Sequence, residues 1–165
     1  EKGRLVSRGL ANHRLYLARL LLAAWERERA DEIIPAIMLD QAYAPGCREH
    51  LIAAYGYFLC HVFDPTGAAT AGAMPRSCSD LPAQIPGKAL PGGIGEFRLR
   101  EEEGLLGGLL APLPVSGPSN SQRRKVADTL AISTAVEWPT PDQVEGWHQR
   151  LSRIFQRMDD SIEEC

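Results

Sequence analysis

The sequence lacks a long uninterrupted apolar run. Its longest apolar stretches, such as LARLLLAAW at residues 17–25, are short and contain a charged side chain, whereas a membrane-spanning helix needs about 20 apolar residues. The opening segment EKGRLVSRGL is not expected to act as a signal peptide, because no apolar stretch follows its basic residues. The sequence therefore predicts a cytoplasmic protein without a membrane partner.

An excess of basic residues is also missing. The 18 Lys and Arg residues are outnumbered by 21 Asp and Glu, for a formal net charge of −3, and a dedicated nucleic-acid-binding domain usually shows a strong basic excess. The sequence contains few cysteines, and their spacing forms no compact disulfide framework: Cys47, Cys60, Cys78 and Cys165. We expect reduced thiols, as is usual in the cytoplasm, and no nucleic-acid partner.

The sequence also lacks the motifs that are typical of catalytic sites. No serine lies in a nucleophile elbow. The glycine-rich stretch PGGIGEF at 91–97 lacks the preceding strand that a phosphate-binding loop requires. A metal site of the helical-bundle type needs Glu-x-x-His motifs on paired helices, and the sequence carries no such pair.

What the sequence does contain is helical periodicity. A first helix is predicted over residues 12–30, with Asn12 as N-cap and residues 1–11 as a flexible extension. Its buried stripe is predicted to consist of Leu17, Leu21 and Ala24, flanked by Leu20 and Trp25. A second helix begins near Pro35 and runs to about Phe63, with a kink or break at Pro45.

The second half of the chain predicts two more helices and two connections. Residues 66–93 are rich in Pro and Gly and are expected to form a long crossover loop, partly ordered along the bundle. A third helix is predicted over 94–110, although its three glycines weaken it. Alternating apolar residues in VADTLAISTAVEW, at 126–138, indicate a short extended insert.

The last helix has the clearest boundary in the chain. Thr140 is the predicted N-cap, Pro141 occupies the first helical position, and Gln143 completes a capping box. Six apolar residues then share one stripe: Val144, Trp147, Leu151, Ile154, Met158 and Ile162. Together these elements predict an all-α fold, a single four-helix-bundle-like domain over residues 12–165.

The stretch GCREHLIAAYGYFLCHVF, at residues 46–63, places two Cys and two His close together in the sequence. On a helix, His50 and His61 share a face but lie about 16 Å apart along the axis, too far to bind one ion. Cys47 and His50 could share an ion only if two further ligands came from elsewhere. We therefore predict neither a metal nor a cofactor.

A ligand pocket is the alternative interpretation of this region. Tyr43, His50, Tyr57 and His61 could line such a pocket. More often, such residues lie at the boundary of a bundle, where the rings pack and the polar atoms reach water.

Four segments carry a resemblance to a known family: NHRLYLARLLLAAW, HLIAAYGYFL, LAIS and RMDDSIEEC. They resemble a family of small bacterial proteins described as domain of unknown function 6586. The resemblance covers about residues 12–63 and 126–165. It implies a helical, cytosolic bacterial protein, and it implies no activity and no catalytic residues.

Two functions follow from these patterns. The first is a non-enzymatic protein-interaction module that binds another protein or a second copy of itself as a homodimer, since no catalytic constellation is found and the 66–93 loop contains apolar residues. The alternative is a small-ligand-binding or enzymatic bundle with a pocket near Tyr57, His50 and His61.

Overall fold

The computed structural model describes residues 2–63, 74–81, 93–104, 106–114 and 137–163 of the chain. The protein is all-α, as predicted. Its helices are α1 (Lys2–Ala30), α2 (Ala36–Phe63), α3 (Gly93–Glu102), α4 (Gly107–Leu110) and α5 (Pro141–Glu163), with a 3-10 turn, η2, at Cys78–Asp80. No helix in the described ranges is both long enough and apolar enough to cross a membrane.

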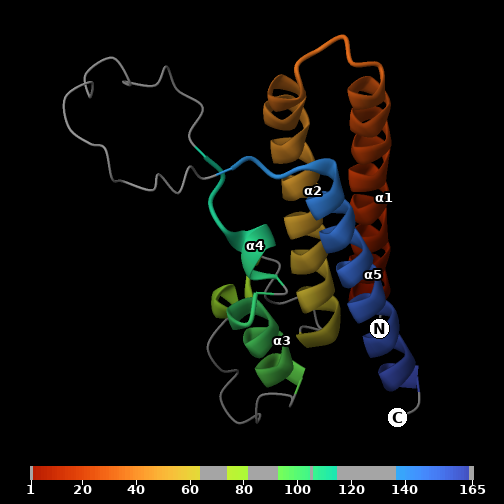
Figure 1. The fold of residues 1–165 in the computed structure, drawn as a ribbon. Helices are drawn as coiled ribbons and strands as arrows, with labels where there is room; N and C mark the ends of the chain where they lie inside the picture. The colour runs from red at the N-terminus through yellow and green to blue at the C-terminus, as the bar shows by residue number, and fades with distance from the viewer. Residues whose placement is uncertain (1, 64–73, 82–92, 105, 115–136, 164–165) are drawn as a thin grey trace, which may run out of the picture.

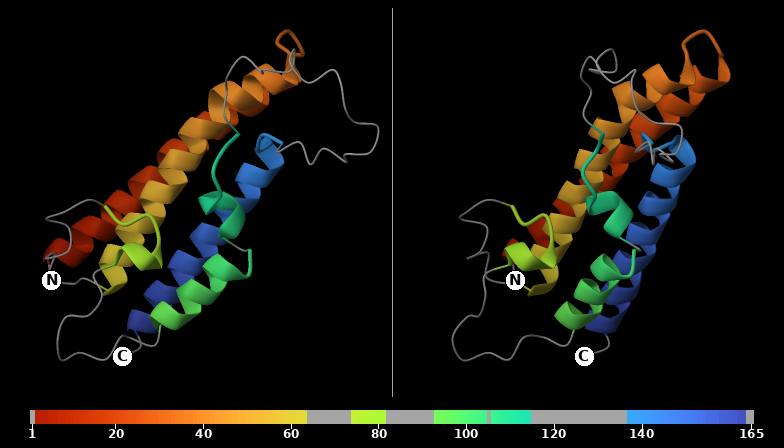
Figure 2. Two further views of the ribbon diagram at one scale, coloured as in Figure 1. Left: turned by 90° about the vertical axis from the view of Figure 1, so that its left-hand side faces the viewer. Right: turned by 60° about the vertical axis from the view of Figure 1, so that its left-hand side comes forward.

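The helices alternate in direction (Figure 1). α1 and α2 form an antiparallel hairpin, which is the most extensive helix pair in the structure. The short α3 and α4 run upward beside α2, and α5 descends against both α1 and α2. The turn between α1 and α2 projects beyond the start of α5 in every view (Figure 2).

α1 is longer than predicted, and it buries a different face from the predicted one. It begins at Lys2, so Asn12 is not its N-cap but an internal residue whose side chain accepts a hydrogen bond from Arg8. The predicted buried stripe is also wrong, because Leu17 and Leu21 are only half-buried and Leu20 is 49% exposed. The buried residues are instead Ala11, Leu15, Ala18, Leu22 and Trp25, at spacings of four and three that keep them on one face.

α2 passes through Pro45 without a break and ends at Phe63, where the sequence predicts its end. Proline removes one backbone hydrogen bond and normally weakens a helix interior. Packing compensates for the loss here, because Ala44 and Cys47, on either side of Pro45, are completely buried. A Cβ atom at Gly46 would lie 3.1 Å from Leu21 of α1, so the two helices approach closely at this point.

The single helix predicted over 94–110 is two helices in the structure. α3 ends at Glu102 and α4 begins at Gly107. Gly104 has a φ of +85°, a left-handed conformation that glycine adopts without the steric penalty of a side chain. The amide of Leu106 donates to the carbonyl of Arg100 across this turn, which closes the end of α3.

Part of the predicted 66–93 loop lies against the bundle. Residues 74–81 cover α2 at Gly56, where a Cβ atom would meet the carbonyl oxygen of Pro75 at 2.1 Å. Only glycine therefore permits this close contact. The rest of that loop, and residues 126–136 of the predicted extended insert, lie outside the described residues.

The start of α5 confirms the predicted capping box. The amide of Thr140 donates to the Gln143 side chain at 3.0 Å, and the amide of Gln143 lies 3.4 Å from the Thr140 hydroxyl. Val144, Leu151 and Ile154 are buried as predicted, and Trp147 and Met158 are partly buried. Phe155 is also fully buried and stacks on Phe58 of α2 with ring centroids 4.0 Å apart.

Replacing Leu151 with Ala should lower the free energy of unfolding by about 2–5 kcal/mol, because a fully buried leucine leaves a cavity. Thr140→Ala should cost only about 1 kcal/mol, the usual loss of an N-cap. Urea unfolding followed by circular dichroism measures both. An equal loss for the two variants would contradict the assignment of Thr140 as a local cap.

Candidate functional site

The four residues of the predicted pocket lie in separate surroundings. Tyr43, in the upper part of α2, stacks on Trp25 with ring planes 9° apart. Its hydroxyl donates to Glu28 at 2.8 Å, and this hydrogen bond raises the pKa of Tyr43. Tyr57 is half-buried and packs against the edge of the core. Both tyrosines thus occupy the boundary positions that the sequence offers as the simpler interpretation.

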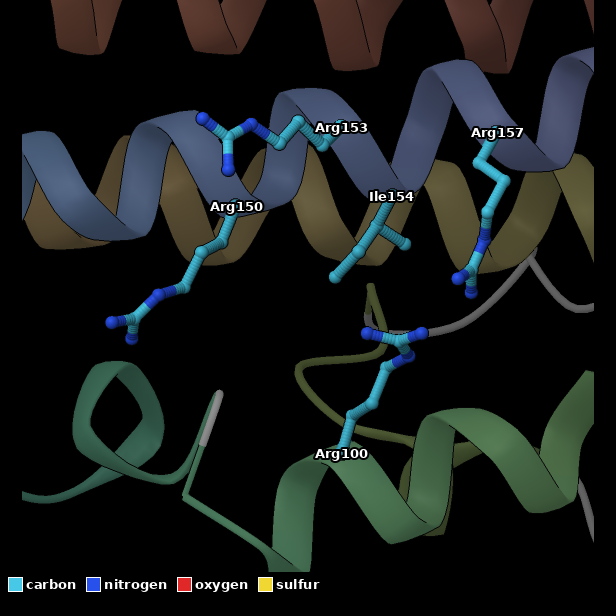
Figure 3. Close-up of a pocket in the computed structure, with 5 residues that line it drawn as sticks. All are labelled: Arg100, Arg150, Arg153, Ile154 and Arg157. Atoms are coloured by element: carbon cyan, nitrogen blue, oxygen red, sulfur yellow. The ribbon is translucent and has the colours of Figure 1, made fainter.

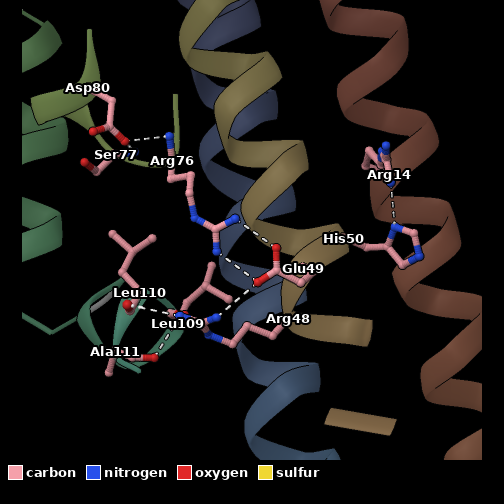
Figure 4. Close-up of polar contacts among 10 residues, drawn as sticks. All are labelled: Arg14, Arg48, Glu49, His50, Arg76, Ser77, Asp80, Leu109, Leu110 and Ala111. Carbon is pink, nitrogen blue, oxygen red and sulfur yellow. Dashed lines mark hydrogen bonds and ion pairs between the residues drawn. The ribbon is translucent and has the colours of Figure 1, made fainter. Parts of the chain in front are cut away.

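His50 faces α1 rather than a pocket. Its Nδ1 atom lies 3.1 Å from Nη1 of Arg14 (Figure 4). The Arg14 guanidinium can only donate, so His50 accepts this hydrogen bond in its neutral form. Burial, together with the positive charge of Arg14 and the proximity of His13, lowers the pKa of His50.

His61, near the lower end of α2, is buried and lies 3.3 Å from Asp159 of α5. Arg8 of α1 donates to the other oxygen of the same carboxylate at 2.6 Å. The Arg8 guanidinium also lies over the Phe58 and Phe155 rings, at 5.4 and 5.3 Å from their centroids. This cluster joins α1, α2 and α5, and its geometry is that of a structural contact.

The Cys and His residues of this region do not gather around a metal position. Within the described ranges, no three side chains of the His, Cys, Asp and Glu types are grouped so that they could hold an ion. α5 contains one Glu-x-x-His motif, at Glu145 and His148. Glu145 pairs with Arg19, and the His148 ring nitrogen lies 3.1 Å from the Leu15 carbonyl oxygen, so both side chains contact α1.

The most extensive polar network fastens the short elements to α2 (Figure 4). Arg48 donates to the backbone carbonyls of Leu109, Leu110 and Ala111 at 2.9, 3.2 and 2.9 Å. These carbonyls at the end of α4 lack helical partners, so Arg48 takes the place of a C-terminal cap. Glu49 receives two hydrogen bonds of 2.9 Å from Arg76, and these bonds lower the pKa of the Glu49 carboxyl.

A second polar cluster lies between α2, η2 and α3. The Tyr55 hydroxyl donates to Glu101 at 2.6 Å, and the amide of Cys78 donates to the same oxygen at 2.8 Å. Burial raises the pKa of Tyr55, and it raises that of the Cys78 thiol to about 11. A nucleophilic cysteine requires a lowered pKa. Cys78 does not have this property, and the contacts of the cluster hold α3 and η2 against α2.

The surface that sequence reasoning missed is the outer side of α1. Val6, Leu10, Tyr16 and Leu20 are 60%, 38%, 59% and 49% exposed. All of these except Tyr16 lie on one line along the helix. We call this line the α1 outer stripe, and its residues are Val6, Leu10, His13, Leu17, Leu20 and Ala24. Its spacing of four and three residues was visible in the sequence, but α1 has two such lines and only one can face the core.

A second exposed apolar group lies at the turn between α1 and α2. It consists of Ile33, Ile34, Ile37 and Met38, of which Ile33 is 83% exposed. These residues all belong to the segment 33–38, which forms the projecting end of the hairpin (Figure 2).

Cys47 and Cys78 should react slowly with iodoacetamide in the native protein. Burial raises the pKa of each thiol from 9.0 to about 11, so each forms about 100-fold less reactive thiolate at pH 8. Mass spectrometry of labelled peptides, with and without urea, measures the difference for each cysteine. Labelling of either residue at the same rate in both conditions would contradict its burial.

The stability of the protein should fall as the pH is lowered from 7.5 to 5.5, because the pKa of His50 lies below its ordinary value of 6.5. The folded state then binds fewer protons than the unfolded state, so acid favours unfolding. The carboxyls with lowered pKa, such as Glu49 and Glu96, also stabilise the folded state, but this stabilisation is lost only below about pH 4.5. Urea unfolding at several pH values should give a smaller slope for His50→Asn in this window, and an unchanged slope would contradict the role of His50.

Comparison with protein-family models, with curated proteins and with solved structures found no match to this chain. The resemblance to domain of unknown function 6586 therefore stays a prediction from the four sequence segments.

Proposed function

We propose that this chain is a protein-interaction module that associates with a second copy of itself through the α1 outer stripe. The observation that carries the proposal is an exposed apolar line on a helix whose opposite side already supplies the core. Contiguous apolar surface of this kind on a protein that is folded in water usually marks an interaction site. The tyrosines and histidines of the alternative pocket lie in separate surroundings. They therefore support a ligand pocket less well than the exposed stripe supports self-association.

The spacing of the stripe suits a partner that is itself a helix. Apolar residues separated alternately by four and three positions are typical of helices that pack as coiled coils. The stripe extends from Val6 to Ala24, about 27 Å at 1.5 Å per residue. A single small-molecule ligand would cover only a small part of such a line.

The charges of α1 leave this stripe free for self-association. Arg8, Arg14 and Arg19 all contact residues of α2 or α5: Asp159, His50 and Glu145. The stripe itself contains only one ionisable side chain, that of His13. An apolar stripe of this kind is complementary to itself, so a second copy of the chain is a suitable partner.

An antiparallel pairing about a two-fold axis near Leu15 brings the whole stripe into contact. Leu10 then packs against Leu20 of the second copy, Val6 against its Ala24, and His13 against its Leu17. In each layer, a residue at position a of the heptad repeat packs against a residue at position d of the other copy, as in antiparallel coiled coils. Gly9 and Ala23, beside the stripe, are small enough to let the helices approach closely.

The double variant Leu10→Glu/Leu20→Glu should convert a dimer to a monomer. Light scattering at tens of micromolar should give the wild-type protein twice the 18.1 kDa of one chain, and the variant the mass of a single chain. Both residues are at least 38% exposed in the described structure, so the helix content should be unchanged by circular dichroism.

The matched control is Ile33→Glu/Met38→Glu, which places the same charges on the exposed apolar residues of the α1–α2 turn. This control should remain dimeric. A monomeric wild-type protein would contradict the proposal. If the control is monomeric and the stripe variant is still dimeric, the interface lies at the hairpin turn. That result would also contradict the proposal.

A further inference from the structure

A pocket between α3 and α5 is lined almost entirely by arginines (Figure 3). It has a volume of about 170 Å³, and its lining residues are Arg100, Arg150, Arg153, Ile154 and Arg157. Ile154 and Arg157 point from α5 toward α3, Arg150 extends toward α4, and Arg153 lies along α5, while Arg100 points back from α3 toward Ile154. The protein as a whole has a net charge of −3, so this local concentration of positive charge is unusual for the chain.

The positive charge of the pocket is only partly compensated. Arg100 donates to Glu96 at 2.7 Å, and Arg157 forms an ion pair with the same carboxylate. Arg150 and Arg153 have no hydrogen bond or ion pair with any described part of the chain. Within the described part of the chain, Glu96 therefore pairs with two of the four arginines, and Arg150 and Arg153 bring two further positive charges to the pocket.

This arrangement works against the stability of α5. Arg150, Arg153 and Arg157 are three and four positions apart, so they are neighbours on one side of the helix. Like charges at these spacings destabilise a helix. An anion bound between the two helices would relieve the repulsion.

We propose that this pocket binds the phosphate group of a small phosphorylated molecule. Guanidinium groups offer paired N–H donors that match two phosphate oxygens at once. A phosphate dianion or a diphosphate compensates the excess charge better than a single carboxylate. This site lies on α3 and α5, and it is independent of the association through α1.

Glu96 acts in this pocket as an internal competitor. It holds Arg100 and Arg157 while the pocket is empty, and an incoming phosphate competes with it for these two donors. Removing the charge of Glu96 should therefore tighten the binding of an anion.

Isothermal titration calorimetry with pyrophosphate, at constant ionic strength, tests the site. The wild-type protein should bind, and Arg150→Gln/Arg153→Gln should weaken binding about tenfold or more. The matched control Arg27→Gln/Arg98→Gln removes the same charge from exposed arginines outside the pocket and should change the affinity less than about twofold. Glu96→Gln should bind more tightly than wild type, and Glu145→Gln, which removes another arginine-paired carboxylate, should not.

A second arm identifies the source of the phosphate. Sedimentation with phosphatidylcholine vesicles that contain phosphatidic acid should retain the protein through Arg150 and Arg153 if the phosphate belongs to a lipid headgroup. Binding of pyrophosphate without such retention assigns the site to a soluble molecule. No binding of either probe, or an equal loss of binding in both double arginine variants, would overturn the proposal.

Discussion

The structure depends on the burial of α2 around nearly its whole circumference. The helix has thirteen buried residues between Leu39 and His61, and these residues do not lie on a single side. A helix that is apolar all round must be surrounded by other elements. α1 covers one side, α5 a second, and α4 together with residues 74–81 a third.

Polar contacts hold the short covering elements where apolar burial alone is small. Arg48 caps α4, Arg76 ties the 74–81 segment to Glu49, and Glu101 joins α3 to both Tyr55 and Cys78. All of these contacts lie at the edge of the core, and the two that involve arginine are charge-assisted hydrogen bonds, which are among the stronger kinds. Most of the polar residues of α2 therefore hold neighbouring elements against this helix.

α1 differs from α2 because neighbours cover only one of its sides. Its buried line, from Ala11 to Trp25, contacts α2 and α5, and the arginines beside that line pair with these helices. The α1 outer stripe lies on the opposite side and has no covering element among the described residues. The proposed self-association follows from this asymmetry between the two helices of the hairpin.

The sequence predicts features that are decided within one or two turns of a helix. The cap at Thr140 and the end of α2 at Phe63 belong to this class, because the deciding residues are adjacent in the chain. The orientation of α1 was not predictable, since its two apolar lines have the same spacing and only tertiary packing chooses between them. Pro45 does not break α2, because packing of its neighbours outweighs one lost hydrogen bond.

The arginine pocket was also invisible in the sequence, because Arg100 and Arg150 come from helices that are far apart in the chain. Each arginine alone is typical of a solvated helix surface. Only the packing of α3 beside α5 brings the four arginines to the lining of one pocket.

The central claim is that two copies meet along α1 in an antiparallel arrangement, and cysteine cross-linking measures this geometry directly. Leu10→Cys and Leu20→Cys proteins are mixed in equal amounts and oxidised, and the linked peptides are identified by mass spectrometry. The account predicts that position 10 of one chain links mainly to position 20 of the other. Links mainly between two copies of position 10, or no more linkage than in a control pair with cysteine at Arg27, would contradict it.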